Sequence, residues 1–268
     1  MLRKSLLASL LVLTAPMSAS AHKMWLLPSE TVLTGPNPSI TVDAAISNDV
    51  FFFNHHALPL AGLSITAPDG SKLAAENQAT LRYRSVFDVA LPQKGTYRIA
   101  ALTSNILATW EEDGGRKFYR GAKEGFASKV PAGAKDLKVT EAVGRVETFV
   151  TNGPPTVDAL KAVGEGIELI PVTHPNDLYA GESATFKLIV DGKPGAGLEV
   201  EIVRGGIRYR DAQEEIQVKA DDQGVFSVQF DEACMYWLET STADDKTTFP
   251  AANGRSLRYS GTLEVLPR

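Results

Sequence analysis

Hydrophobic and polar residues alternate in short stretches along most of the chain. This two-residue period is typical of half-buried β-strands. In the clearest stretch, single glutamates separate Leu198, Val200 and Ile202. Similar stretches, separated by glycine, proline, aspartate and asparagine, lie at 40–46, 64–67, 84–91, 96–102, 143–150, 184–190, 225–230, 235–240 and 257–266. Many short strands separated by turns predict an all-β fold of sandwich type. A turn at Lys94-Gly95 is expected to join the strands on either side of it as a hairpin.

Helical patterns are scarce and short. One or two helical turns are expected within 120–127, and a short helix at 157–163 would begin after Thr156 as its N-cap. The run Thr-Asn-Gly-Pro-Pro at 151–155 ends the first set of strands. The pattern therefore predicts two immunoglobulin-like β-sandwich modules with one or two short helices, arranged as an N-terminal β-sandwich at 22–150, a linker with a short helix at 151–166 and a C-terminal immunoglobulin-like sandwich at 167–268.

The first 21 residues follow the order of a secretory signal peptide. A basic start with Arg3 and Lys4 precedes an uncharged apolar run, and the small residues Ala19-Ser20-Ala21 form a cleavage site. The apolar run is well short of the ~20 residues that span a bilayer. We therefore expect cleavage after Ala21, export to the periplasm, and a mature chain without a transmembrane segment that begins with His22.

The net charge, the cysteine content and the sequence motifs limit the partners and the chemistry that can be expected of this chain. Cleavage removes Arg3 and Lys4 from the 27 basic residues, so 25 remain against 32 acidic ones and the net charge is −7. The chain has no basic stripe, which argues against nucleic acid as a partner. The single cysteine, Cys234, has no internal disulfide partner and is expected to be a small buried hydrophobe. Phosphate loops, nucleophile elbows and His-Glu-x-x-His motifs are absent from the sequence, which disfavours an enzyme without excluding one.

The four histidines are the main candidates for chemistry, and His22 is the first of them. As the first residue of the mature chain it would offer two nitrogens, the α-amine and ring Nδ1, to one metal ion. A second histidine across a sheet would complete the arrangement called a histidine brace. Nitrogen-rich sites suit Cu(II) or Ni(II), and imidazole also accepts zinc or iron. The alternative is an exposed terminal histidine without a function.

The other three histidines lie in two segments. His55 and His56 follow Phe51–Phe53, which could anchor a loop that presents a histidine, and adjacent residues of an extended segment point in opposite directions. His174 stands between two prolines, near the joint of the two modules. The alternatives are a solvated loop pair for the first segment and a locally hydrogen-bonded turn residue for the second.

These considerations give one hypothesis for the site. The predicted metal ligands are His22, His55 and His174. Metal-bound imidazoles usually need a partner for the second ring nitrogen, and the candidates for that role are Asp43, Asp49 and Tyr236. Trp25 and Trp237 could wall the site, although core packing explains them better.

Several segments of the mature chain resemble a known family. They are Ala21-His22-Lys23-Met24-Trp25-Leu26-Leu27-Pro28-Ser29, then 42–49, 169–175, 191–194 and 235–239. They are similar to the domain of unknown function 4198 (DUF4198) family, formerly described as nickel-uptake, NikM-like periplasmic proteins. Cys234 stands where this family suggests glycine, which puts the local turn in doubt. The resemblance implies an exported, β-rich protein associated with metal uptake or with TonB-dependent uptake. The expected N-terminal histidine, taken alone, also resembles that of copper-resistance C carriers and lytic polysaccharide monooxygenases.

Four functions remain open at this point. The first is a periplasmic metal-binding protein, with copper or nickel in a histidine-brace-like site, that assists the uptake or handling of a transition metal or metal complex. The second is a non-catalytic adaptor that docks a TonB-dependent receptor or a membrane transporter. The third is a copper-dependent monooxygenase. The last is a small-ligand binder, in which the organic part of a chelated metal complex would be contacted by Trp110, Lys117, Tyr119 and Arg120.

Overall fold

The computed structural model describes residues 22–268, so the expected signal peptide at 1–21 lies outside the described residues. The regular structure of the described chain is almost entirely β-strand, in three sheets, which confirms the predicted all-β sandwich class. Helix is limited to α1 (Lys123–Lys129) and the 3-10 turns η1 (Asp158–Leu160) and η2 (Ile207–Tyr209). No helix among these residues is both long and apolar enough to cross a membrane.

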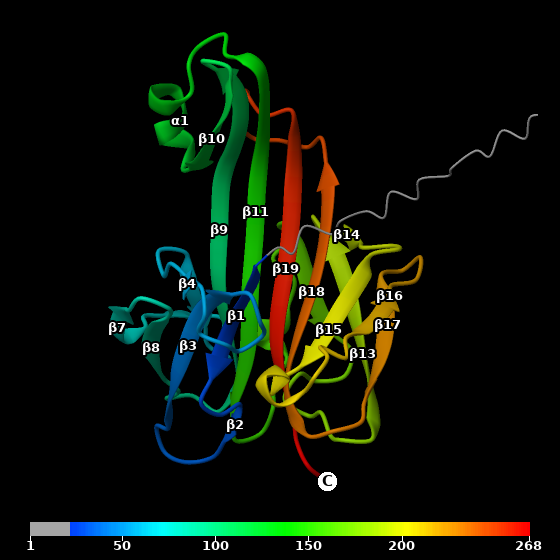
Figure 1. The fold of residues 1–268 in the computed structure, drawn as a ribbon. Helices are drawn as coiled ribbons and strands as arrows, with labels where there is room; N and C mark the ends of the chain where they lie inside the picture. Colours follow the sequence, from blue (N-terminus) through cyan, green and yellow to red (C-terminus); the bar gives the residue numbers. More distant parts are fainter. Residues whose placement is uncertain (1–21) are drawn as a thin grey trace, which may run out of the picture.

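A ten-stranded sheet runs through the middle of the molecule (Figure 1). Its strands are β2 (Val32–Leu33), β5 (Leu63–Thr66), β6 (Lys72–Leu73), β9 (Gly95–Glu112), β10 (Gly115–Gly121), β11 (Lys135–Asn152), β15 (Glu199–Arg204), β16 (Ile216–Lys219), β18 (Cys234–Asp244) and β19 (Gly254–Val265). The order is β16-β15-β18-β19-β11-β9-β5-β6, with β10 on β9 and β2 on β11. The upper ends of β9 and β11 carry β10 and α1 above the rest of the fold (Figure 1).

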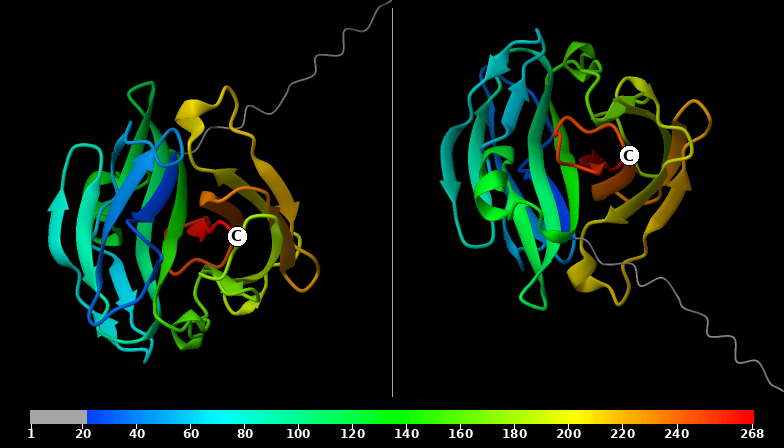
Figure 2. Two further views of the ribbon diagram at one scale, coloured as in Figure 1. Left: turned by 90° about the horizontal axis from the view of Figure 1, so that it is seen from below. Right: turned by 90° about the horizontal axis from the view of Figure 1, so that it is seen from above.

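Two smaller sheets cover this central sheet. One contains β1 (Lys23–Pro28), β3 (Ser39–Ser47), β4 (His56–Ala57), β7 (Glu76–Thr80) and β8 (Ser85–Ala90). The other contains β12 (Ile167–Pro171), β13 (Glu182–Val190), β14 (Lys193–Pro194) and β17 (Val225–Phe230). Figure 2 shows them on either side of the long strands.

The two sandwiches share the central sheet. Along β11, Val146 and Val150 belong to the core under the five-stranded sheet, whereas Phe149 belongs to the core under the four-stranded sheet. Alternate residues of a strand point to opposite faces, so the two small sheets pack on opposite faces of β11. β11 also pairs in parallel with β19 from the end of the chain. The expected linker at 151–166 therefore begins within a strand of this sheet, and η1 buries Leu160 in the second core.

Two local predictions were wrong. Strands β8 and β9 do not form a hairpin, because β8 pairs with β3 and β7 while β9 pairs with β5, β10 and β11. The segment between them crosses from one sheet of the sandwich to the other, and residues of both strands, such as Phe87 and Ile99, pack in the core between those sheets. Thr156 does not cap the short helix either: its Oγ1 accepts a hydrogen bond from the Thr96 backbone N–H at 3.0 Å.

The tryptophans near the N-terminus and near the end of the chain are core residues. Trp25 is 0% exposed and Trp237 1%, and both pack with Val203 between β1 and the β15–β18 pair. The Trp25 indole N–H donates to Ser47 Oγ at 2.7 Å, and the Trp237 indole N–H donates to the Met24 carbonyl at 2.8 Å. Each buried donor is satisfied, so these rings connect the five-stranded sheet to the second half of the central sheet.

Glu141 on β11 connects the upper part of the sheet to α1 and to the loop between β18 and β19, and it makes the stability of the protein sensitive to acid. Burial opposes its ionisation, but bonds from Lys123 Nζ at 2.7 Å and from the Thr248 N–H and hydroxyl at 2.6 Å lower the pKa of Glu141 to about 2. A carboxyl with a depressed folded pKa contributes stability above its unfolded pKa, and this contribution is lost as the pH falls towards about 2. We expect Glu141→Gln to remove about 3 kcal/mol of this acid-dependent stability.

Urea unfolding at about pH 7 and about pH 3 measures this contribution. The matched control is Glu111→Gln, because Glu111 pairs with Lys135 through an exposed carboxyl. Its effect on the free energy of unfolding should stay within about 0.5 kcal/mol. Equal pH dependence in wild type and Glu141→Gln would refute the prediction.

Candidate functional site

Three of the four histidines form one cluster at the edge of the five-stranded sheet. The rings of His22 and His55 stack with centroids 3.8 Å apart and an interplanar angle of 4°. The ring of His56 follows at 4.5 Å from that of His55, tilted by 45°. His22 and His56 are exposed and His55 is half-buried. Three imidazoles from two separate segments therefore meet at one surface.

The strand register explains how these residues meet. Met24 on β1 and His56 on β4 both pair with Ile46 of β3, from opposite sides. His22 directly precedes β1, so it lies beside the end of β3, where the chain turns towards His55. Figure 1 shows the start of β1 and β4 at the upper end of the five-stranded sheet, partway along the long strands.

The loop before His55 is held from inside the protein, as predicted from its phenylalanines. Phe51 and Phe53 pack edge-on to Trp25, with centroids at 5.5 and 5.3 Å. Asn54 bridges the loop: its Oδ1 accepts from the Asn48 N–H at 2.9 Å and its Nδ2 donates to Asp49 Oδ2 at 2.8 Å. These contacts fix the position of His55, which lies in a bend and not in a strand, so that its ring and that of His56 are not forced to opposite sides.

The surroundings of His55 favour the neutral form of its ring. Partial burial lowers the pKa of His55, and the neighbouring rings of His22 and His56 lower it further. His56 Nδ1 lies 3.0 Å from the Ala57 carbonyl, which accepts hydrogen bonds only. In the neutral ring, this contact places the proton on Nδ1 and the lone pair on Nε2. Neutral imidazoles with an available lone pair are the form that binds metal ions.

His174 lies elsewhere. Its Nε2 donates to the Thr156 carbonyl at 3.2 Å and lies 3.0 Å from Thr96 Oγ1, while its Nδ1 accepts from the Asn176 N–H at 3.2 Å. Thr96 is at the start of β9, whereas His56 borders a cavity with Asn105 of the same strand. Thr96, which contacts His174, and Asn105, which lies near His56, are nine residues apart on β9, and this length of strand spans about 30 Å. The structure therefore does not bring His174 to His22 and His55.

The proposed partners of the imidazoles are also dispersed. The Asp43 carboxylate lies 3.3 Å from Arg84, and burial raises its pKa, opposed by that guanidinium. Tyr236 is buried in the second core, and its hydroxyl donates to the Glu232 carbonyl at 3.0 Å. Asp49 is the member of this set that lies in the histidine loop, where its carboxylate binds Asn54.

A cavity of about 290 Å³ adjoins the cluster. It is lined by Met24, Ile46, His56, Leu58, Pro59, Thr103, Asn105 and Arg120. Thr103, Asn105 and Arg120 are functional candidates that the histidine pattern did not reveal, although Arg120 belongs to the small-ligand set named above. The other members of that set lie apart: Trp110 is 6% exposed in the small upper core, and the Tyr119 hydroxyl donates to the Ala122 carbonyl at 2.6 Å.

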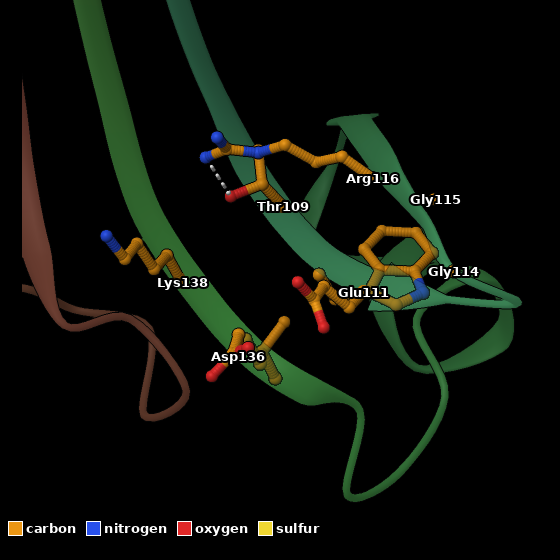
Figure 3. A pocket seen from close by; sticks show the side chains of 9 residues that line it. Thr109, Glu111, Gly114, Gly115, Arg116, Asp136 and Lys138 are labelled. Atoms are coloured by element: carbon orange, nitrogen blue, oxygen red, sulfur yellow. Dashed lines mark hydrogen bonds between the residues drawn. The ribbon is translucent and has the colours of Figure 1, made fainter.

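Two further cavities lie away from the histidines. One, of about 530 Å³, lies between the tips of β9, β10 and β11, where Glu111, Asp136 and Lys138 face it and Arg116 donates to Thr109 Oγ1 (Figure 3). The other, of about 450 Å³, is bordered by Arg255, whose guanidinium is paired with Asp191 and Asp244. In both cavities acidic and basic side chains occur together, and neither includes a histidine.

Fold and site together define an all-β protein in which two sandwiches share a central sheet and a histidine cluster borders a small cavity. The chain belongs to the family described as domain of unknown function (DUF4198), whose sequence profile matches residues 19–244. No curated protein matches the chain.

Comparison with solved structures gives only distant likenesses. The D0–D1 domain of intimin is 12% identical, with 90% of this chain and 97% of that chain covered and a TM-score of 0.24. A DUF4785 family protein from Legionella pneumophila is 8% identical, with 83% and 53% covered and a TM-score of 0.26. A marsupial T cell receptor is 11% identical, with 92% and 74% covered and a TM-score of 0.22.

Proposed function

We propose that this chain is an exported, periplasmic metal-binding protein that holds Cu(II) or Ni(II) at its N-terminal histidine. The observation that carries the proposal is the meeting of His22 and His55, whose rings are 3.8 Å apart although they come from different segments. In this proposal the ligands are the α-amine and ring of His22, the ring of His55, and His56 at the position first assigned to His174. An all-nitrogen set suits Cu(II) and Ni(II), and zinc or iron would bind with different geometry.

The proposed site becomes complete only after cleavage. Within residues 22–268, no group of three or more His, Cys, Asp or Glu side chains is already arranged to hold a metal ion. The α-amine of His22 exists only when the bond after Ala21 is cut, and its reference pKa near 7.7–8.0 lets a metal displace the proton at neutral pH. The parallel rings must also turn until their lone pairs converge. The exposed position of His22 leaves it free to do so.

The surroundings of the cluster favour metal handling over oxidation of a polysaccharide. A monooxygenase of that type would need a flat, exposed aromatic surface around His22. Phe51 and Phe53 instead pack inward on Trp25, and the Arg208 guanidinium covers Phe52 at 4.8 Å from the ring centroid. We therefore propose a role in transition-metal uptake or handling. A non-catalytic adaptor for a TonB-dependent receptor or membrane transporter would instead keep its partner after loss of all four histidines.

The first test is intact-mass spectrometry with metal analysis. The full chain, including its own leader, is expressed and purified from the periplasm, with and without added copper, nickel, zinc and iron. We expect a mass that starts at His22 and one equivalent of copper or nickel. A chain that starts elsewhere would overturn the amine-based site. Correct cleavage without retained metal would favour the adaptor.

A further inference from the structure

The cavity beside the histidine cluster differs in charge from the 530 Å³ and 450 Å³ cavities. Its eight lining residues include Arg120 and His56 but no Asp or Glu. None of the ion pairs among residues 22–268 involves Arg120. In the 530 Å³ cavity, by contrast, Arg116 and Lys138 are accompanied by Glu111 and Asp136. The small cavity therefore carries positive charge in an otherwise acidic protein, and this charge favours binding of an anion.

Strand pairing places the polar groups of this cavity on one face. Arg120 of β10 pairs with Leu107 of β9. Residues that pair across an antiparallel sheet share a face, and so do alternate residues of one strand. Arg120, Asn105 and Thr103 consequently belong to the same face of the central sheet. They provide a guanidinium, an amide and a hydroxyl, all of which can donate hydrogen bonds to oxygen.

The remaining walls of the cavity are apolar. Met24 and Ile46 are each 8% exposed, and Leu58 is 0% exposed. An inorganic anion such as phosphate gains nothing from apolar walls, whereas the carbon skeleton of an organic acid does. A volume of about 290 Å³ suits a small molecule of this kind. Because Arg binds carboxylates in a two-pronged geometry, the preferred anionic group is a carboxylate.

We propose that this cavity binds a small organic polycarboxylate, so that the cargo of the protein is a metal–carboxylate complex and not the bare ion. The inference rests on the proposed metal site. His56 borders both the cavity and the histidine cluster, which places a bound carboxylate next to the metal ligands. Carboxylate oxygens bind copper and nickel well, so the organic acid supplies metal ligands that the imidazoles do not.

Titration calorimetry with citrate as the probe tests this inference. Citrate is titrated into the metal-free protein and into the Cu(II)- or Ni(II)-loaded protein, each with a chain that starts at His22. We expect citrate to bind both forms and inorganic phosphate to bind at least about 10-fold more weakly. Arg120→Ala should weaken citrate binding about 10- to 100-fold, and Arg120→Lys should weaken it less because the charge remains.

Arg116→Ala is the matched control, because it removes the same charge from the same strand at a different cavity. It should leave citrate affinity within about twofold of wild type. Thermal unfolding of each variant verifies the fold. Equal effects of Arg120→Ala and Arg116→Ala, equal binding of phosphate and citrate, or no citrate binding to either form would overturn the inference. Metal binding with no citrate binding would overturn this inference and leave the proposed function intact. Arg120-dependent citrate binding without metal binding would overturn the proposed function and the metal–carboxylate cargo, and would leave only the carboxylate site.

Discussion

One alanine placed before His22 is expected to weaken Cu(II) or Ni(II) binding by at least about 100-fold. The extension converts the α-amine of His22 into an amide, which is a poor donor at neutral pH, and moves the new amine away from the ring. Even loss of a group that only orients a ligand costs roughly 10- to 100-fold in metal affinity, so loss of a direct ligand costs more. Because His22 is exposed, the extension should leave the free energy of unfolding of the metal-free protein unchanged.

Competition titration with a metal-binding dye measures the affinity of the extended chain, the natural mature chain and two histidine variants. His55→Ala should weaken binding as strongly as the extension. His174→Ala is the control, because the ring nitrogens of His174 are engaged by Thr156, Thr96 and Asn176. It should lower stability without changing metal affinity. A site that tolerates the extension, or one that fails with His174→Ala, would contradict the proposed ligand set.

The strands were easier to predict than the way they assemble. Stretches such as 184–190 and 225–230 became β13 and β17 almost without change, because alternation is a local property of the sequence. The parallel pairing of β11 with β19 joins segments more than a hundred residues apart, for example Val143 with Leu257. Nothing local specifies such a pairing, and for that reason the sequence predicted two sandwich modules but not the sheet that they share.

The same limit applies to the site. The terminal position of His22 and the phenylalanines before His55 are local features, and both residues were assigned to one site on that basis. Whether His174 lies near them depends on the length of β9, which extends ten residues beyond the predicted strand end at Leu102. The residues predicted to contact a small ligand do not lie together for a related reason. Trp110 is buried in the upper core, whereas Arg120 lines the cavity beside the histidines.

The largest stability effect is expected from a buried ionic network that connects the two sandwiches. Glu147 of β11 is 1% exposed and accepts hydrogen bonds from Arg145 at 2.9 Å and from the Tyr259 hydroxyl at 3.0 Å. Arg98 lies 3.8 Å from the same carboxylate and donates to the carbonyls of Leu160 and Lys161. Burial, reinforced by Glu147, raises the pKa of Tyr259 well above its ordinary value, so the phenol remains a donor.

Glu147→Ala should therefore lower the free energy of unfolding by about 3–5 kcal/mol, because it leaves the buried guanidiniums of Arg98 and Arg145 without their shared carboxylate. Urea unfolding measures the loss, and Glu239→Ala is the control, since the pair of Glu239 with Arg258 is partly exposed and should cost about 1 kcal/mol. Adding Arg145→Ala to Glu147→Ala removes one of the stranded charges. The double variant should therefore lose less than the sum of the two single losses. Strict additivity would mean that Arg145 and Glu147 do not stabilise one another, and would contradict the role of this pair in the network.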